Sequence, residues 1–425
     1  MVVAEVQPGH EQALRRVLGQ MNIGPGRADP LNRLLPFADF DTLHFARFAI
    51  LVDTTYGDLA AQGSPTTALP TYLSFLGDCD GPGDRQLDEF VRVAESGLRE
   101  VFAHCVGCPG GSGLADWLRA RNLPVAAAYA NWTGRTARRV REERAIAEAL
   151  ARQVSLLGDT GPGNLQAIRT QLVAFVAAER TQGRLLVSDD PPTPVGWWWR
   201  NLAHVVATPL IGVLALPFLL LYSPLFIWQL RRRERADAEI VPAPDVAHVA
   251  ELATFEDRGI TNAFTALGRV KPGRFRRILV TVLVALLDYA ARHLYGRGHL
   301  TRVQSIHFAR WVFLDDKQRL LFASNYDGIL ESYMDDFINK VAWGLNLVFS
   351  NGVGYPRTNW LVQGGARNSQ AFKNYLRRHQ VPNSVWYKAS PGLTAMDLAR
   401  HGRIRDGLER RAMSDADIEA WLRSM

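Results

Sequence analysis

Two stretches of the chain are near-copies of each other. Residues 73–109 read LSFLGDCDGPGDRQLDEFVRVAESGLREVFAHCVGCP, and residues 320–356 read LLFASNYDGILESYMDDFINKVAWGLNLVFSNGVGYP. The two stretches align without a gap and are identical at 13 of 37 positions, far more than unrelated segments share. Self-similarity of this kind indicates that one structural unit occurs twice in the chain.

The likeness extends outward from these stretches in both directions. His44-Phe45-Ala46-Arg47 returns as His307-Phe308-Ala309-Arg310, each within an apolar run typical of a strand. The intervening segment has no counterpart in either copy. We therefore expect five regions, listed in chain order: repeat 1 at 1–150, a helical linker at 151–196, an apolar membrane segment at 197–235, a linker at 236–261 and repeat 2 at 262–425.

Each copy has the pattern of a β-α-β-β-α-β unit, the split βαβ order of ferredoxin-like domains. In the first copy, strands are expected at 2–6, 42–53, 69–76 and 125–130, and helices at 11–21 and 87–103. With this order and the Pro8-Gly9 turn, the chain resembles the dimeric α+β barrel group, in which two ferredoxin-like units set their sheets face to face. The resemblance implies an α+β fold in which the two repeats form an internal pseudo-dimeric barrel.

The composition narrows the class of protein. The chain has 425 residues, 47% of them hydrophobic, and a net charge of +7. A mild positive excess suits an anionic lipid surface but is too dilute to indicate nucleic acid as a partner. Three cysteines cannot build a disulfide framework. Walker, GxGxxG, HExxH and GxSxG motifs are absent from the sequence.

The segment from Asn201 to Leu230 contains no Lys, Arg, Asp or Glu. Trp197-Trp198-Trp199 precedes it and Arg231-Arg232-Arg233 follows it, and such flanks are typical of a bilayer interface. A membrane-embedded segment is predicted; the alternative is a buried helical hairpin in a soluble core.

Repeats that pack on each other must lie on one side of a bilayer, and two full crossings need about 40 residues. Pro217 is expected to break the run into a re-entrant hairpin in one leaflet, with the repeats on the cytoplasmic side; a single span is the alternative. The shorter apolar run Ile278–Leu287 is expected to be core.

Candidate chemistry lies in the repeated residues. GDCDG at 77–81, and SNYDG at 324–328 without the leading Gly, resemble the GxxDG motif of dye-decolorizing haem peroxidases. That resemblance implies haem as cofactor. Asp327 or Asp80 would move a peroxide proton, with the neighbouring Asn325 and Tyr326 as further candidates, and Arg310 would stabilise the departing oxygen. His307, with His44 as its counterpart, would be the iron ligand. The alternatives are an Asp-Gly turn and hydrogen-bonded core histidines, with Arg310 on the opposite strand face from His307.

Two further features stand apart from this set. Residues 357–367 are an insertion in the second copy, where binding residues often concentrate, the alternative being a solvated loop. Cys105 and Cys108 have a CxxC spacing without a partner pair.

These observations lead to two hypotheses about the function. The first is a membrane-associated, haem peroxidase-like oxidoreductase acting on an apolar or lipid-like substrate in the inter-sheet cavity. The second is a non-catalytic lipid-binding or membrane scaffolding protein with no cofactor.

Overall fold

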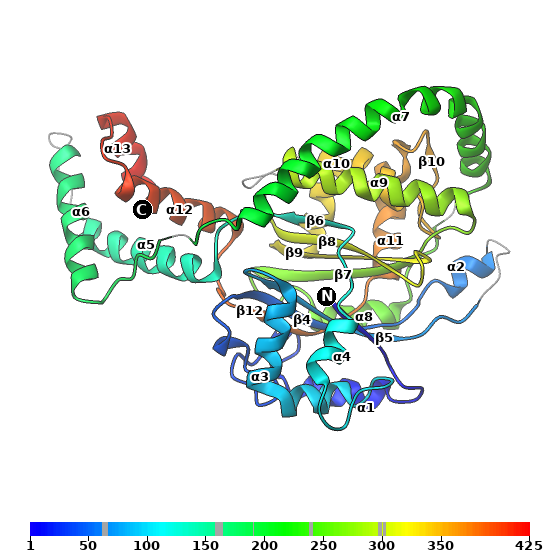
Figure 1. Ribbon diagram of the computed structural model, residues 1–425, viewed down its shortest axis with the longest axis horizontal. Coiled ribbons are helices and arrows are strands. Elements are labelled where there is room, and N and C mark those ends of the chain that lie inside the picture. Colours follow the sequence, from blue (N-terminus) through cyan, green and yellow to red (C-terminus); the bar gives the residue numbers. More distant parts are fainter. Residues whose placement is uncertain (62–66, 158–164, 190, 238–240, 296–299, 301–302) are drawn as a thin grey trace.

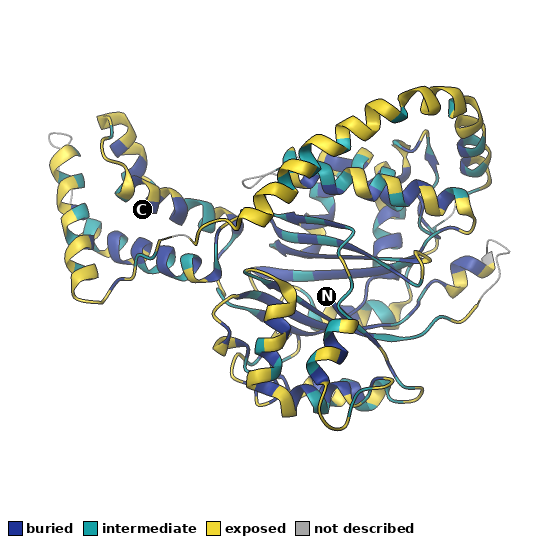
Figure 2. Ribbon diagram, in the orientation of Figure 1, coloured by how far each residue is buried: buried dark blue, intermediate teal, exposed yellow. Residues whose placement is uncertain are grey.

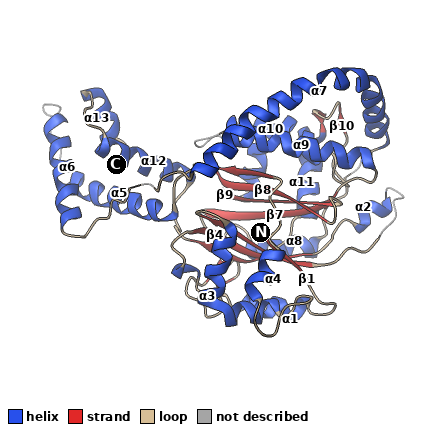
Figure 3. Cartoon of the chain, in the orientation of Figure 1, coloured by secondary structure: helices blue, strands red, loops and turns tan. Residues whose placement is uncertain are grey.

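The computed structural model describes residues 1–61, 67–157, 165–189, 191–237, 241–295, 300 and 303–425. Two four-stranded antiparallel sheets lie at its centre, with helices on the outer face of each (Figure 1, Figure 3). The first sheet has the order β1 (Val2–Glu5), β5 (Tyr72–Cys79), β4 (Leu43–Leu51) and β12 (Asn383–Lys388). The second sheet has the order β6 (Ala127–Ala130), β8 (Ile306–Leu314), β9 (Arg319–Asp327) and β7 (Thr261–Arg269). The chain is thus α+β.

The last strand of each repeat lies in the other repeat's sheet. β12 pairs with β4, where Trp386 is opposite Arg47, and β6 pairs with β8, where Ala128 is opposite Arg310. The expectation that each last strand completes its own unit is therefore wrong. The nine-residue strands β4 and β8 leave an edge that the short last strand of the other repeat covers, which satisfies backbone hydrogen bonds and ties the sheets together.

Each sheet buries its outer face under its own helices. The first sheet is covered by helices α1 (Glu11–Gly19), α3 (Gly83–Phe102) and α4 (Leu114–Ala120), and the second by helices α9 (Arg274–His293), α10 (Leu330–Phe349) and α11 (Ser369–His379). Smaller elements are β2 (Asn22–Gly24), β3 (Arg27–Ala28), α2 (Tyr56–Ala61), α8 (Val246–Phe255), β10 (Thr358–Asn359) and β11 (Gln363–Gly364). Leu76, Leu267 and Leu321 belong to a cluster that joins the two inner faces.

A helical appendage projects from one end of the sheets (Figure 1). It contains α5 (Ala137–Leu157), α6 (Leu165–Thr181), α12 (Ala395–Glu409) and α13 (Asp415–Leu422). Leu150, Leu172, Ile404 and Trp421 share its separate core. Both repeats therefore contribute to the appendage, and α5 continues beyond the boundary expected at residue 150.

The apolar segment forms one helix, α7 (Val195–Ala236), instead of the expected hairpin. Pro209, Pro217 and Pro224 lie inside this helix. A proline removes one hydrogen bond and bends a helix without having to end it. In Figure 2 most of α7 is exposed, and Figure 1 shows it arching over α9. The run Ile278–Leu287 lies in α9, where Leu279, Val280 and Val284 are buried and Ile278, Val282 and Leu286 are exposed.

Equivalent glycines of the two repeats differ in their surroundings, which allows a matched test of packing. A methyl group added to Gly97 in α3 would lie 1.9 Å from the backbone oxygen of Leu34, whereas one added to Gly344 in α10 would meet only Val341 Cγ1, at 3.2 Å. We expect Gly97→Ala to lower the free energy of unfolding by about 2–3 kcal/mol, as overpacking does. Gly344→Ala should stay within about 1 kcal/mol of the wild type, since alanine favours a helix. Urea unfolding measures both, and equal losses would contradict the packing described for α3.

Candidate functional site

Each repeat places a histidine against an aspartate at the end of its sheet. His44 of β4 has its Nε2 atom 3.0 Å from Oδ1 of Asp80, which directly follows β5. His307 of β8 has its Nε2 atom 2.7 Å from Oδ1 of Asp327, the last residue of β9. The repeated sequence motifs therefore produce two equivalent histidine–carboxylate pairs.

Both aspartates also hold the first turn of a helix. The backbone N–H of Ala137, at the start of α5, donates to Asp80 Oδ2 at 2.8 Å. The N–H of Ala395, at the start of α12, donates to Asp327 Oδ2 at 2.7 Å. A carboxylate at a helix N-terminus satisfies a free N–H group and favours the helix dipole. The pairs thus fasten the appendage to the sheets.

The glycine of each Asp-Gly pair serves the turn predicted for it. Gly81 and Gly328 have φ values of 82° and 87°, a left-handed conformation that favours glycine. Asp327 has a wider role than the turn, because its Oδ1 also accepts a hydrogen bond from Thr261 Oγ1 at 3.0 Å.

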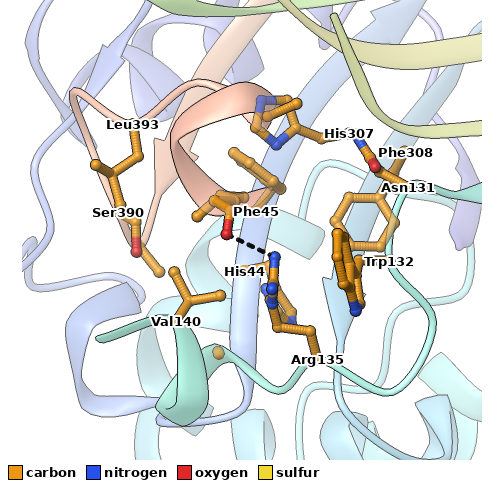
Figure 4. Close-up of a pocket in the computed structure, with 14 residues that line it drawn as sticks. His44, Phe45, Asn131, Trp132, Arg135, Val140, His307, Phe308, Ser390 and Leu393 are labelled. Carbon is orange, nitrogen blue, oxygen red and sulfur yellow. Dashed lines mark hydrogen bonds between the residues drawn. The ribbon is translucent and has the colours of Figure 1, made fainter. Parts of the chain in front are cut away.

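A small cavity of about 50 Å³ lies between the two pairs and is lined by both repeats (Figure 4). The ring centroids of Phe45 and His307 are 5.4 Å apart, and those of His44 and Phe308 are 5.6 Å apart. Arg135 also lines the cavity; its guanidinium lies 3.9 Å from the Trp132 ring and donates to the Leu398 carbonyl at 2.8 Å. An imidazole against a carboxylate can hold or pass a proton, so the chemistry available here is proton transfer.

Arg310 and Asn325 lie elsewhere, in the buried seam between the sheets. Arg310 forms an ion pair with Asp78 of the other sheet, and Asn325 donates to Asp78 Oδ2 at 2.8 Å. Asp78 occupies the position equivalent to Asn325. Burial lowers the pKa of Arg310 to about 10. Arg310 therefore stabilises the seam, and it is not among the residues that line the cavity with His44 and His307.

Arg47, the counterpart of Arg310, lies in the same seam. Its Nη1 donates to the Phe264 carbonyl at 2.9 Å, and its guanidinium lies 5.0 Å from the Trp386 ring. Burial, with repulsion from Arg310, lowers the pKa of Arg47 to about 9. Both guanidiniums are charged at neutral pH, so the seam holds two cations, of which Arg310 is paired with Asp78.

Tyr326 lies neither in the seam between the sheets nor in the wall of the cavity. It stacks on Tyr333 of α10, with ring centroids 4.1 Å apart, and burial raises its pKa well above the ordinary value. Asn325 and Tyr326 are neighbours on a strand and so point to opposite faces. Tyr326 is therefore part of the core of the second repeat.

Sequence reasoning missed Trp132, Arg135 and Asp78. The replacement of Asp78 by Asn325 was a visible difference between the copies, but only the pairing across the sheets gives it meaning. Of the CxxC pair, Cys105 is buried in the first core and Cys108 packs against it. Among the described residues, no group of three His, Cys, Asp or Glu is arranged to hold a metal ion.

The two histidine–aspartate pairs differ in burial, so substitutions of the two aspartates can be compared with each other. The side chain of Asp327 is 11% exposed and that of Asp80 is 23% exposed. Removing an acceptor from a buried donor costs about 1–3 kcal/mol. Asp327→Ala should lower the free energy of unfolding by about 3 kcal/mol and Asp80→Ala by about half as much, in urea titrations followed by tryptophan fluorescence. An Asp327→Ala variant as stable as the wild type would contradict the fastening role.

No known protein family, curated protein or solved structure matches this chain.

Proposed function

We propose that this is a monotopic membrane protein, held on one leaflet by α7, with its two-sheet body at the bilayer surface. The supporting observation is that α7 is exposed and apolar over its middle yet attached to the body at both ends. Its most apolar stretch has a mean hydropathy of 2.3, and none of that stretch is buried.

At both of its ends, α7 contacts the same helix, α9. Near the start of α7, His204 Nδ1 lies 2.8 Å from His293 Nε2, at the end of α9. Near the end of α7, the Phe226 ring lies 5.5 Å from Phe275, at the start of α9. α7 thus runs antiparallel to α9 and along the surface of the body. If α7 crossed a bilayer upright, α9 and its arginines would have to enter the hydrocarbon with it, which costs about 2.5–3.5 kcal/mol for each charge.

The middle of α7 is apolar on every side. Leu219, Leu220 and Leu221 are consecutive and all more than half exposed, and successive helical residues point about 100° apart. A helix that is apolar all round requires a fully apolar surrounding. The hydrocarbon of one leaflet would provide that apolar surrounding if the curved middle of α7 entered it. Trp197 and Trp228 lie at the two ends of the arch and are exposed, as expected of tryptophans at a membrane interface.

Of the two functions that the sequence left open, this geometry favours lipid binding or scaffolding over catalysis. The seam between the sheets is filled by side chains, and the cavity beside the histidines, at about 50 Å³, is far below the roughly 300–1,000 Å³ of pockets for organic ligands. An apolar or lipid-like partner is therefore assigned to the surface of α7.

Proton-transfer or haem chemistry at the paired histidines is the second candidate, supported by the shared cavity. For haem, the fit is poor, because the cavity lined by His44 and His307 has a volume of only about 50 Å³, far below that of pockets for organic ligands.

The membrane proposal is tested by flotation with neutral phosphatidylcholine vesicles. Leu214→Asp with Leu221→Asp should reduce the vesicle-bound fraction at least about tenfold, because charged residues are costly in hydrocarbon. The matched control is Leu31→Asp with Leu156→Asp, which changes leucines that are equally exposed but lie outside α7. The control should bind as the wild type does. Equal losses in both variants, or a wild type that stays in solution as a dimer through α7, would reject the proposal.

An ultraviolet-visible absorption spectrum distinguishes the two candidate functions. The detergent-purified protein is expected to show no Soret band and to carry co-purified phospholipid detectable by mass spectrometry. A Soret band that disappears in His307→Ala, but persists in the equally buried His379→Ala, would instead establish the haem reading.

A further inference from the structure

We infer that a pocket in the helical appendage binds a long-chain fatty acid, with its carboxylate beside Arg180 and its hydrocarbon chain along the pocket floor. The pocket has a volume of about 590 Å³, within the roughly 300–1,000 Å³ typical of sites for organic ligands. It is lined by residues of α5, α6 and α12, so both repeats contribute to it. The inference rests on the proposed function in one respect, because the bilayer beside α7 is taken as the source of the fatty acid.

The floor and walls of the pocket are apolar. Ile146 of α5 and Val176 of α6 are buried in the floor. Val173, Val187 and Leu408 are partly exposed in the walls. Apolar side chains around a cavity favour an apolar ligand, because its binding removes their surface from water. A hydrocarbon chain therefore fits this lining.

A hydrogen-bonded network holds one wall of the pocket in place. Ser188 donates to Glu142 through its backbone N–H, at 2.8 Å, and through its hydroxyl, at 2.6 Å. The buried Arg405 donates to the Ser188 carbonyl at 2.6 Å and to Glu409 at 2.8 Å. The loop that carries Val187 is thereby fixed between α5 and α12. The pocket is thus formed before a ligand enters, as ligand sites usually are.

Arg180 places a positive charge at the rim of the pocket. It is exposed near the end of α6, and it forms no ion pair with a carboxylate of the described residues. The neighbouring Glu179 is held by Arg184, whose Nε donates to it at 2.7 Å. Glu409, on the α12 side, is held by Arg405. A guanidinium binds a carboxylate through paired N–H donors, so Arg180 suits an anionic head.

The combination of one rim cation and an apolar floor favours a single-chain acid over other lipids and over a protein partner. A fatty acid has one carboxylate for Arg180 and one chain for the floor. A phospholipid would add a second chain and a larger head. A helix of a partner protein has a diameter of about 10–12 Å with its side chains, which is much thicker than a hydrocarbon chain.

The pocket lies close to the helix that is proposed to enter the leaflet. Val187, in the pocket wall, is eight residues before Val195, where α7 begins. Eight residues of extended chain span at most about 29 Å. A fatty acid that leaves the bilayer beside the start of α7 therefore has a short path to the pocket.

The test uses the full chain kept in solution by amphipol. It measures displacement of the fluorescent fatty acid cis-parinarate by laurate and by dodecanol, a neutral chain of the same length. The wild type should bind laurate roughly fivefold more tightly than dodecanol, the gain expected of an exposed ion pair. Arg180→Gln should remove that preference. Arg152→Gln should keep it, because this exposed arginine of α5 is not in the pocket lining.

A second pair of variants tests the apolar floor. Ala177→Trp should weaken the binding of both laurate and dodecanol at least about tenfold, because the indole displaces several methylene groups of the chain from the floor. Ala178→Trp is the matched control. Ala178 is the next residue of α6 and is also exposed, but it is not in the pocket lining. This control should bind both ligands as the wild type does.

The outcomes separate this inference from the proposed function. A wild type that binds laurate no more tightly than dodecanol, or an Ala178→Trp variant that loses as much as Ala177→Trp, would overturn the fatty-acid site. Dimerisation that Ala177→Trp abolishes would assign the pocket to a second copy of the chain instead. A wild type that does not float on phosphatidylcholine vesicles rejects the membrane proposal alone, because laurate binding is measured without a bilayer. Thermal unfolding verifies that each variant is folded.

Discussion

The exchange of the last strands is the constraint on which the rest of the structure depends. β12 completes the sheet of the first repeat and β6 completes that of the second, so neither sheet is whole without the other repeat. Because β6 leads into α5 and β12 leads into α12, the exchange also brings the starts of both helices to the same end of the sheets. There they meet the two aspartates, and the helical appendage is assembled from both halves of the chain.

The same exchange creates the seam that holds Arg47 and Arg310. Each guanidinium contacts the opposite sheet, Arg310 through Asp78 and Arg47 through the Phe264 carbonyl, while the Trp386 ring beside Arg47 belongs to the same sheet as Arg47. Buried charges are tolerated only when they are paired or fully hydrogen-bonded, so these contacts fix how the sheets lie on each other. The change from Asp78 to Asn325 breaks the symmetry of the repeats at this point. Residues that look like one catalytic set in the sequence are thereby divided between a seam, a cavity and a core.

The long helix α7 is held to the body at its ends and not by the exchanged strands. Its prolines bend α7 without ending it, and this bending lets it keep contact with both ends of α9 while its middle stands away from the body. Glu234 then fastens its last turns to the hairpin of the second repeat. Attachment at both ends makes the helix part of the body's surface, and the proposed contact with one leaflet rests on this geometry.

The sequence by itself determined the repeat, the α+β class, most strands and helices and the apolar segment, because periodicity, turn residues and long charge-free runs are local signals. It also marked His44, Asp80, His307 and Asp327 as candidate site residues, but only the structure showed that each histidine pairs with the aspartate of its own repeat. Only the tertiary structure decided which sheet receives each last strand, since the pattern of a short apolar strand does not encode its partner. It likewise decided that Arg310 faces Asp78 and that three prolines give an arch in place of a hairpin. Those outcomes depend on contacts between residues far apart in the sequence, which no local pattern records.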